Sequence, residues 1–300
     1  MNINEYQLYE EVKEHTPTNF PYNTYICSIP LNFKEVPLHW HSEIEIIAIK
    51  KGAGIVTVDL DRKTVTTGDI IFIRPGQLHS IEQDGTNSME YENILFKKEL
   101  LISGQYDLCA TQFILPLMKG NIHTTTFFTP VLPYYDDISS CIEEIDKLSD
   151  KKKDGYQLML KSTLFKLIFS IISNKDTGEN TTNIQTKSLE KLKFILKYVE
   201  EHYSEHITIE DMASLTFYSK SHFMKFFKSH IGTGFIDYLN NYRLMMAEQM
   251  IKTSDLTILE IAQLSGFDNI SYFNRMFKKK YGVSPSILRK NIKDTLNSRF

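Results

Sequence analysis

The sequence has little cysteine and no long apolar run, and both absences narrow the classes of protein it can encode. Its cysteines, Cys27, Cys109 and Cys141, are scattered and form no C-x-x-C pair. This argues against a disulfide framework or a cysteine-based zinc site and fits a reducing cytoplasm. The apolar run from Leu164 to Ile172 is too short to span a membrane and is interrupted by Lys166. The first residues carry neither a basic segment nor an apolar run, so we expect neither a signal peptide nor a membrane partner.

Neither sign of charge is in large excess overall, since the net charge of the 300 residues is −3. It is unevenly distributed, however. Residues 188–300 hold 16 Lys and Arg against 12 Asp and Glu, while residues 1–187 hold 18 against 25. A basic C-terminal part on an acidic remainder suggests that only the C-terminal part meets nucleic acid. A chain of this length is expected to contain more than one domain.

Short β-branched and aromatic runs, separated by turn residues, fill the N-terminal part of the sequence. They predict strands at Tyr25–Ile29, Ile44–Lys50, Gly54–Leu60, Lys63–Val65, Asp69–Ile73 and Glu90–Phe96. The turn signals between them include Gly52-Ala-Gly54 and Thr67-Gly68. Regularly spaced short strands of this kind favour a small barrel or jelly roll.

Three histidines and one glutamate mark a candidate site in this barrel. His39, His41 and Glu45 would share one face of an extended strand, because strand side chains alternate. His79 follows a tight Pro-Gly turn. Three imidazoles and one carboxylate suit iron, manganese, nickel or zinc. A polar organic effector held by hydrogen bonds, or a purely structural role inside the barrel, would explain the same residues.

The spacing of these four residues resembles that of the cupin barrel. In cupins, two His and one Glu of a first motif and one His of a second can hold a divalent metal. The second motif departs from the pattern, because Arg74 stands where a proline is common and Gln83 where an asparagine often follows. The resemblance therefore implies an effector-binding pocket without a resident cofactor, with a divalent metal at the four positions and cupin catalysis as alternatives.

Two amphipathic helices are expected after Pro133. The first has the apolar stripe Ile138, Cys141, Ile142, Ile145 and Leu148. The second, after a charged turn, is apolar over a wider arc that comprises Leu158, Leu160, Leu164, Phe165, Leu167, Ile168 and Ile171. Packing against both the barrel and the first helix would explain this arc. A homodimer interface, which would bury the excess, is our prediction.

The C-terminal third contains one helical unit twice. Ile209, Ala213 and Leu215 recur 49 residues later as Ile258, Ala262 and Leu264. Phe223, Lys225, Phe227, Lys228 and Gly232 recur 50 residues later as Phe273, Arg275, Phe277, Lys278 and Gly282. Each unit reads as two short helices joined by a turn, which is a helix-turn-helix. A helix over residues 235–251, about 25 Å long, would hold the two units about one turn of DNA apart.

The second unit carries a family signature. The stretches Ile258-Leu-Glu-Ile-Ala-Gln-Leu-Ser-Gly-Phe267, Tyr272-Phe-Asn-Arg-Met-Phe-Lys-Lys279 and Gly282-Val-Ser-Pro285, with Arg289, resemble those of AraC/XylS-type transcription regulators. The resemblance covers residues 190–290. It implies that two recognition helices enter adjacent major grooves, while a cupin-like front with a helical hairpin senses a ligand and dimerises.

The resemblance also implies which side chains face DNA. In the first recognition helix they are Ser221, Met224, Lys225 and Lys228, and in the second Ser271, Tyr272, Asn274, Arg275, Lys278 and Lys279. Asn and Arg can contact adenine and guanine bidentately, whereas lysines, including Lys220, suit phosphates. Ser and Met are weak base readers, so the second helix should specify sequence and the first should anchor. A structural ion pair is the alternative role for Arg275.

Together these observations predict an α+β chain of two domains. A cupin-like β-barrel with a helical hairpin, residues 1–173, would bind an effector and dimerise. A linker, residues 174–187, would lead to an all-α tandem helix-turn-helix domain, residues 188–300. We expect a cytoplasmic, non-enzymatic, ligand-responsive transcription activator whose partners are double-stranded DNA, a small molecule such as a carbohydrate, a second copy of the chain and RNA polymerase. The alternative is a metal-binding cupin, sensor or enzyme, with an appended DNA-binding module.

Overall fold

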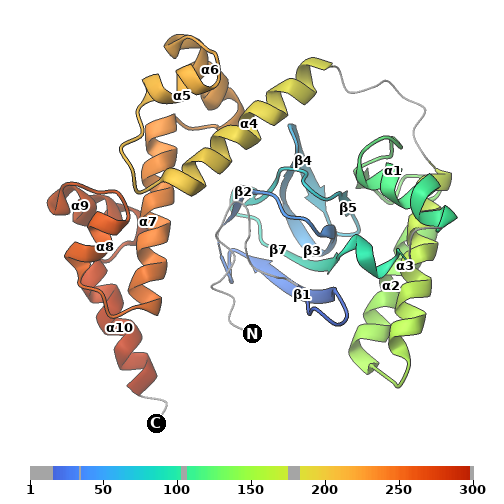
Figure 1. The fold of residues 1–300 in the computed structure, drawn as a ribbon. Coiled ribbons are helices and arrows are strands. Elements are labelled where there is room, and N and C mark those ends of the chain that lie inside the picture. The colour runs from blue at the N-terminus through green and yellow to red at the C-terminus, as the bar shows by residue number, and fades with distance from the viewer. Residues whose placement is uncertain (1–15, 34, 103–106, 175–182, 298–300) are drawn as a thin grey trace. The chain divides into compact units, whose positions relative to one another are not determined.

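The computed structural model describes residues 16–33, 35–102, 107–174 and 183–297. The chain divides into two compact units, Met1–Thr186 and Lys187–Phe300. The first combines an antiparallel sheet with helices, and the second is built from helices joined by turns, with no strand among its described residues (Figure 1). The prediction of an α+β, two-domain chain is confirmed. No described helix is long and apolar enough to cross a membrane.

The sheet of the first unit is organised around one long strand. Its strands are β1 (Tyr22–Ile29), β2 (Glu35–His39), β3 (Ile44–Val58), β4 (Asp61–Thr66), β5 (Ile70–Ile73), β6 (His79–Gln83), β7 (Met89–Phe96) and β8 (Phe127–Phe128). The first half of β3 pairs with β5 and β7, and its second half pairs with β4 and β6. β3 therefore joins two sets of antiparallel strands into one barrel-like sheet.

The two strands predicted on either side of Gly52 are in fact this single strand, so that prediction is wrong. Gly52 does not end β3: it adopts φ 80°, pairs with Met89 of β7, and directly follows an irregularity in that pairing between Ile49 and Lys51. A Cβ at this position would lie 1.9 Å from the carbonyl oxygen of Ser88. The glycine thus serves a close approach of two backbones while the strand continues. The strands β2, β6 and β8 were not predicted.

Alternation along β3 separates two hydrophobic clusters. Ile44, Ile46 and Ala48 belong to a cluster that includes the helices of the first unit. Ile47 and Ile49 belong to a second cluster, formed by the opposite face of the sheet. Because side chains alternate along a strand, Glu45 lies on the face of Ile47 and Ile49, in the interior of the sheet.

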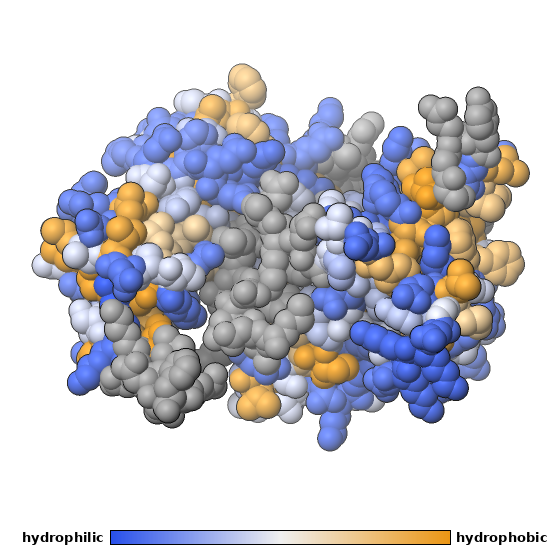
Figure 2. All heavy atoms as spheres, turned by 60° about the horizontal axis from the view of Figure 1, so that its bottom comes forward, coloured by the Kyte–Doolittle hydropathy of each residue, from blue (hydrophilic) through white to orange (hydrophobic). Residues whose placement is uncertain are grey.

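Helices α2 (Tyr135–Lys151) and α3 (Tyr156–Ser173) cover the outer face of this sheet, preceded by η2 (Lys98–Leu100), η3 (Ala110–Ile114) and α1 (Leu115–Met118). Most of the predicted apolar stripe of α2 is buried. The wide apolar arc of α3 is divided: five of its members are buried in the core, namely Leu160, Leu164, Leu167, Ile168 and Ile171. Leu158 and Phe165 are exposed, as are Met159 and Phe169. Apolar atoms gather on the surface of this part of the unit (Figure 2).

The second unit contains α4 (Asn183–His202), α5 (Ile209–Leu215), α6 (Lys220–Ile231), α7 (Phe235–Thr253), α8 (Ile258–Leu264), α9 (Ile270–Tyr281) and α10 (Pro285–Asn297). α4 starts at residue 183, so the last five residues of the predicted linker are helical; residues 175–182 lie outside the described part. Adding residues to an existing helix costs little, which explains the earlier start.

The two helix-turn-helix units are capped in the same way. Thr208 and Asp211 form a capping box at the start of α5, and Thr257 and Glu260 form one at the start of α8. The side chains of Ser219 and Asn269 cap α6 and α9. Both recognition helices end at a left-handed glycine, Gly232 and Gly282, which are the repeated glycines of the two units.

Candidate effector site and DNA-binding face

The predicted His and Glu side chains converge, although the sequence did not indicate which elements bring them together. They do not lie on one strand: His39 ends β2, His41 lies in the turn that follows, and Glu45 is on β3. His79 opens β6 and is the cross-strand partner of His39. The four side chains are buried, and their ligand-capable atoms all lie within 4.8 Å of one another. The shared-face prediction is therefore wrong in its geometry, although the residues it grouped do meet.

The histidine rings are oriented by contacts of their outer nitrogens. Nδ1 of His39 lies 2.9 Å from the carbonyl oxygen of Pro37, and Nδ1 of His79 lies 2.9 Å from that of Gln77. A carbonyl oxygen only accepts, so both Nδ1 atoms donate. In the neutral form of these rings, Nε2 then carries a lone pair.

The inner nitrogens face one carboxylate. Nε2 of His41 and Nε2 of His79 each lie 2.9 Å from Oε2 of Glu45. On the outer side of His41, Nδ1 lies 3.6 Å from Oε2 of Glu43, a buried carboxylate that the sequence did not single out. A lone pair on Nε2 of His79 would repel the carboxylate oxygen. The arrangement therefore requires positive charge at its centre, either a proton or a metal cation.

The pKa values agree with this electrostatic picture. Burial opposes the charge of His79, but the neighbouring Glu45 outweighs it and raises the pKa of His79. Burial likewise opposes the charge of Glu45, yet His79 and His41 hold the pKa of that carboxyl well below its usual range. Burial and the two neighbouring imidazoles lower the pKa of His39 well below its usual value. Burial raises the pKa of Cys27 in the same interior to about 11, so this cysteine stays a thiol.

The second unit exposes most of the predicted DNA-facing residues. On α6 these are Ser221, Met224, Lys225 and Lys228, and on α9 they are Ser271, Asn274, Arg275, Lys278 and Lys279. The phenylalanines expected in the core, Phe223, Phe227, Phe273 and Phe277, are fully buried. The exception is Tyr272, which is half-buried and whose hydroxyl accepts a hydrogen bond of 3.2 Å from Nδ2 of Asn240 on α7.

Arg275 and Lys220 differ in their partners. Within the described part of the chain, Arg275 forms no ion pair with a carboxylate, and its guanidinium carbon lies 5.4 Å from the centroid of the Tyr272 ring. The alternative of a structural ion pair for Arg275 has no support among the described residues. Lys220, expected at a phosphate, instead pairs with Glu210 of α5. Both partners of that pair are exposed, so water and DNA can compete for the lysine.

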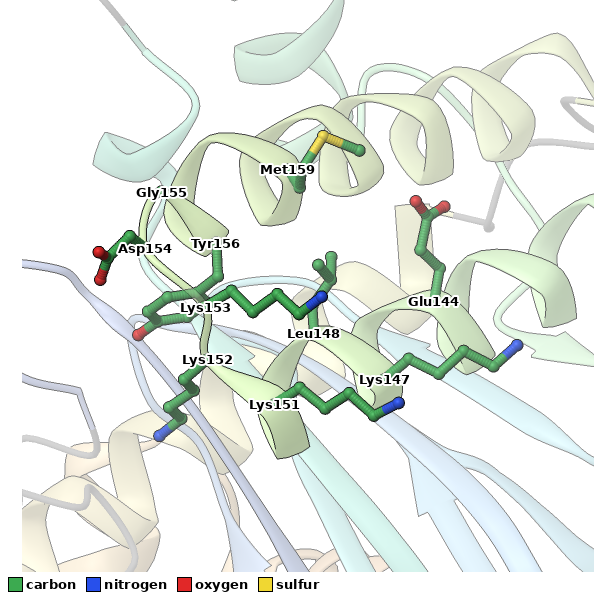
Figure 3. A pocket seen from close by; sticks show the side chains of 10 residues that line it. All are labelled: Glu144, Lys147, Leu148, Lys151, Lys152, Lys153, Asp154, Gly155, Tyr156 and Met159. Atoms are coloured by element: carbon green, nitrogen blue, oxygen red, sulfur yellow. The ribbon is translucent and has the colours of Figure 1, made fainter.

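A further hollow, of about 370 Å³, lies at the turn between α2 and α3 (Figure 3). Its lining comprises Glu144, Lys147, Leu148, Lys151, Lys152, Lys153, Asp154, Gly155, Tyr156 and Met159. Lys147, Lys151 and Lys153 extend toward one side in Figure 3, and Lys152 extends away from them. Most of the lining residues are exposed, so the hollow lacks the buried, fixed polar groups that orient a small ligand.

Comparisons with known proteins agree with this architecture. Residues 33–168 match the family described as "AraC-like ligand binding domain", and residues 212–291 match a "Helix-turn-helix domain". The raffinose operon transcriptional regulatory protein RafR of Pediococcus pentosaceus is 31% identical over 249 residues, which cover 81% of this chain and 83% of RafR. The HTH-type transcriptional regulator YdeC of Bacillus subtilis is 24% identical over 95% of this chain and 97% of its own.

Solved structures include the DNA-binding domain of AdpA in complex with a target DNA. It is 25% identical, covers 35% of this chain and 95% of its own, and gives a TM-score of 0.34. The family models match both parts of the chain, and RafR exceeds 30% identity over more than two thirds of each sequence. The chain therefore belongs to the AraC/XylS family of helix-turn-helix transcription regulators.

Proposed function

We propose that the chain is a cytoplasmic, ligand-responsive transcription activator in which a small molecule bound in the first unit changes how the second unit occupies a promoter. One observation carries the proposal: a buried polar cluster in a barrel and two exposed basic helix faces occur in the same chain. The ligand must bind one arrangement of the DNA-binding units better than another, since only differential affinity shifts an equilibrium. Activation implies a contact with RNA polymerase.

A carbohydrate is the effector class we propose first. The name of the Pediococcus relative ties that protein to a raffinose operon. The imidazoles and the carboxylate of the cluster are hydrogen-bonding groups of the kind that sugar hydroxyls require. Promoter binding should respond to the effector in the native chain, and the response should be lost when His39, His41 and His79 are changed to Ala. A response that survives these changes would place the effector elsewhere.

A second function, response to a divalent metal, is favoured by a specific observation. The Nε2 atoms of His41 and His79 converge on the same carboxylate oxygen, and two of the three outer Nδ1 atoms donate to backbone carbonyls. Imidazoles oriented by such outer contacts are typical of metal sites. His39, His41, Glu45 and His79 would hold the ion, which would fix the ends of β2, β3 and β6 together. Elemental analysis of the purified chain should then find iron, manganese, nickel or zinc in stoichiometric amount.

The proposed DNA contact of α9 can be tested at Asn274 and Arg275. Changing either residue to Ala should weaken binding to a specific site by about 1–3 kcal/mol and relax preference at one base pair. Lys278→Ala serves as the matched control, because losing a phosphate contact should weaken binding to all sequences and reduce the salt dependence. Selection of binding sites from random DNA measures both effects. If neither Ala variant alters the selected sequence, α9 is not the base-reading helix.

The exposed apolar residues of α3 support the proposal that the first unit dimerises. Leu158, Phe165 and Phe169 are spaced by seven and four residues, which places them on one side of the helix. Their exposed fractions are 76%, 37% and 69%, and Met159 adds another 52% exposed side chain beside them. Contiguous apolar surface of this kind is costly in water, and a twofold contact between two copies of α3 would cover it.

Charge placed on this side of α3 should separate the dimer. We expect Leu158→Glu and Phe169→Glu to shift the full chain from dimer to monomer in light scattering coupled to size exclusion, because each would bury an unpaired carboxylate at the contact. Lys197→Glu is the control, since Lys197 is exposed on a different helix, α4, and the change likewise introduces a carboxylate. Variants that remain dimeric at micromolar concentration would refute an α3 interface.

A further inference from the structure

A series of basic and aromatic side chains in contact runs through the second helix-turn-helix unit to Arg275. The guanidinium carbon of Arg243, on α7, lies 6.0 Å from the ring centroid of Phe267 in the turn. The Phe267 ring lies 6.2 Å from that of Tyr272 on α9. The Tyr272 ring in turn lies 5.4 Å from the guanidinium carbon of Arg275. These distances fall within or near the range of cation–π and aromatic contacts.

Arg243, at the inner end of this series of side chains, is held by two hydrogen bonds. Arg243 donates from Nε to the carbonyl oxygen of Tyr203 and from Nη2 to that of Glu205, both at 2.7 Å. Asn240, one turn earlier on α7 and buried, donates to the Tyr272 hydroxyl. α7 therefore contacts the Tyr272 hydroxyl directly, through Asn240, and the Tyr272 ring indirectly, through Arg243 and Phe267. Only Arg275, at the outer end, is exposed.

The first helix-turn-helix unit repeats the inner contacts of this arrangement with different residues. Nζ of Lys191, on α4, lies 3.8 Å from the ring centroid of Tyr218 and donates to the carbonyl oxygen of Thr216. The Tyr218 ring lies 4.1 Å from the His222 ring on α6. Lys225 then occupies the place that Arg275 has in the second unit, at the offset of 50 residues. Recurrence of the inner contacts in both helix-turn-helix units, with different side chains, argues that these contacts serve the recognition helix.

We propose that Tyr272 is a positioning residue that orients Arg275 for base reading, and that Asn240 holds it in place from α7. This inference rests on the proposed DNA contact of α9. A free Arg side chain samples many rotamers and loses that freedom on binding, whereas a guanidinium stacked on a fixed ring loses less. Tyr272 thus acts through Arg275 and does not itself read a base, in contrast to the role that the family resemblance implied.

A double-mutant cycle in the full chain separates positioning from direct contact. The measured quantity is the preference for a selected DNA site over the same site altered at the base pair that Arg275 reads. We expect Tyr272→Leu to reduce this preference about three- to fivefold, the scale of a cation–π contact at a partly exposed position. Tyr272→Phe keeps the ring and loses the hydroxyl, so it should match Asn240→Ala, with a loss of about twofold.

The decisive comparison is made in an Arg275→Ala background. There Tyr272→Leu should cause no further loss, because the residue through which it acts is gone. A loss of the same size in that background would overturn the positioning role and make Tyr272 a direct or merely structural contributor. An Arg275→Ala variant with undiminished preference would overturn the proposed base contact as well as this role. Circular dichroism at 222 nm confirms that each variant is folded, and the conservative Tyr272→Phe remains informative if Tyr272→Leu is not.

Discussion

Changing Glu45 to glutamine should abolish the metal response of the barrel. Oε2 of Glu45 is the point on which His41 and His79 converge, so the carboxylate supplies the negative charge that a divalent cation needs. A glutamine amide has similar size but is neutral, and its NH₂ group can donate to an imidazole nitrogen that would otherwise bind the cation. We expect the affinity for the metal to fall by at least about 100-fold, more than the loss typical of an outer contact.

Thermal unfolding with and without a chelator measures this effect. Metal at about 100 times its Kd stabilises a folded site by about 2.7 kcal/mol, so the chelator should lower the Tm of the native chain by several degrees. The Glu45→Gln variant should show no such change. Glu43→Gln is a graded control: Glu43 lies on the outer side of His41, so its loss should weaken metal binding only about 10- to 100-fold.

A different result would assign the central charge to a proton. If elemental analysis finds no stoichiometric metal and added iron, manganese, nickel or zinc leaves the Tm unchanged, the metal response is refuted. The contact between His79 and Glu45 would then be a buried ion pair. An organic effector would be the remaining candidate ligand of the barrel. Elemental analysis and the Tm with added metal, both on the native chain, therefore decide whether the cluster responds to a metal.

The sequence identified the members of this cluster but not how they meet. His39 and His79 lie opposite each other because β2 pairs with β6, and no local signal encodes that pairing of segments about 40 residues apart. Their Nδ1 atoms are oriented by carbonyl oxygens of Pro37 and Gln77, which depend on the backbone of the two turns. Residue type and spacing thus predict the available chemistry, while ring orientation requires the folded backbone.

The helical unit was more predictable, because its signals are local. The capping residue Thr208, the recognition helices and their terminal glycines follow from short sequence patterns and agree with the structure. The exposure of Tyr272 was not predictable from helix periodicity. It is half-buried because it packs against the hydrophobic cluster that includes Phe267, and Asn240, 32 residues earlier, donates a hydrogen bond to its hydroxyl. A side chain on a helix face that looks solvent-exposed in sequence can therefore be held by a neighbouring helix.

The repeat also brings two unlike residues to one backbone position, and this predicts opposite effects on stability. Gly266 and Phe217, offset by 49 residues, both occupy the turn before a recognition helix and both have positive φ, 80° and 57°. A Cβ at Gly266 would lie 2.7 Å from the Tyr203 carbonyl oxygen and 2.8 Å from Nε of Arg243. Gly266→Ala should therefore destabilise the second unit by about 3 kcal/mol, from left-handed strain and a disturbed charged hydrogen bond.

At Phe217 the expected change in the free energy of unfolding has the opposite sign. Its side chain is 91% exposed, so packing does not offset the left-handed backbone. Phe217→Gly should relieve about 1–2 kcal/mol of strain and lose about 0.5–1 kcal/mol to the flexibility of glycine in the unfolded chain, which leaves a net gain of about 0.5–1 kcal/mol. Urea unfolding followed by circular dichroism at 222 nm reports on the helices of both units, so a shift of that transition without a shift in tryptophan fluorescence assigns the change to the second unit. The chain's single tryptophan, Trp40, lies in the first unit, so its fluorescence is the internal control. Equal losses of stability at both positions would mean that the exposed Phe217 stabilises the turn. The two helix-turn-helix units would then accept the same left-handed backbone for different reasons.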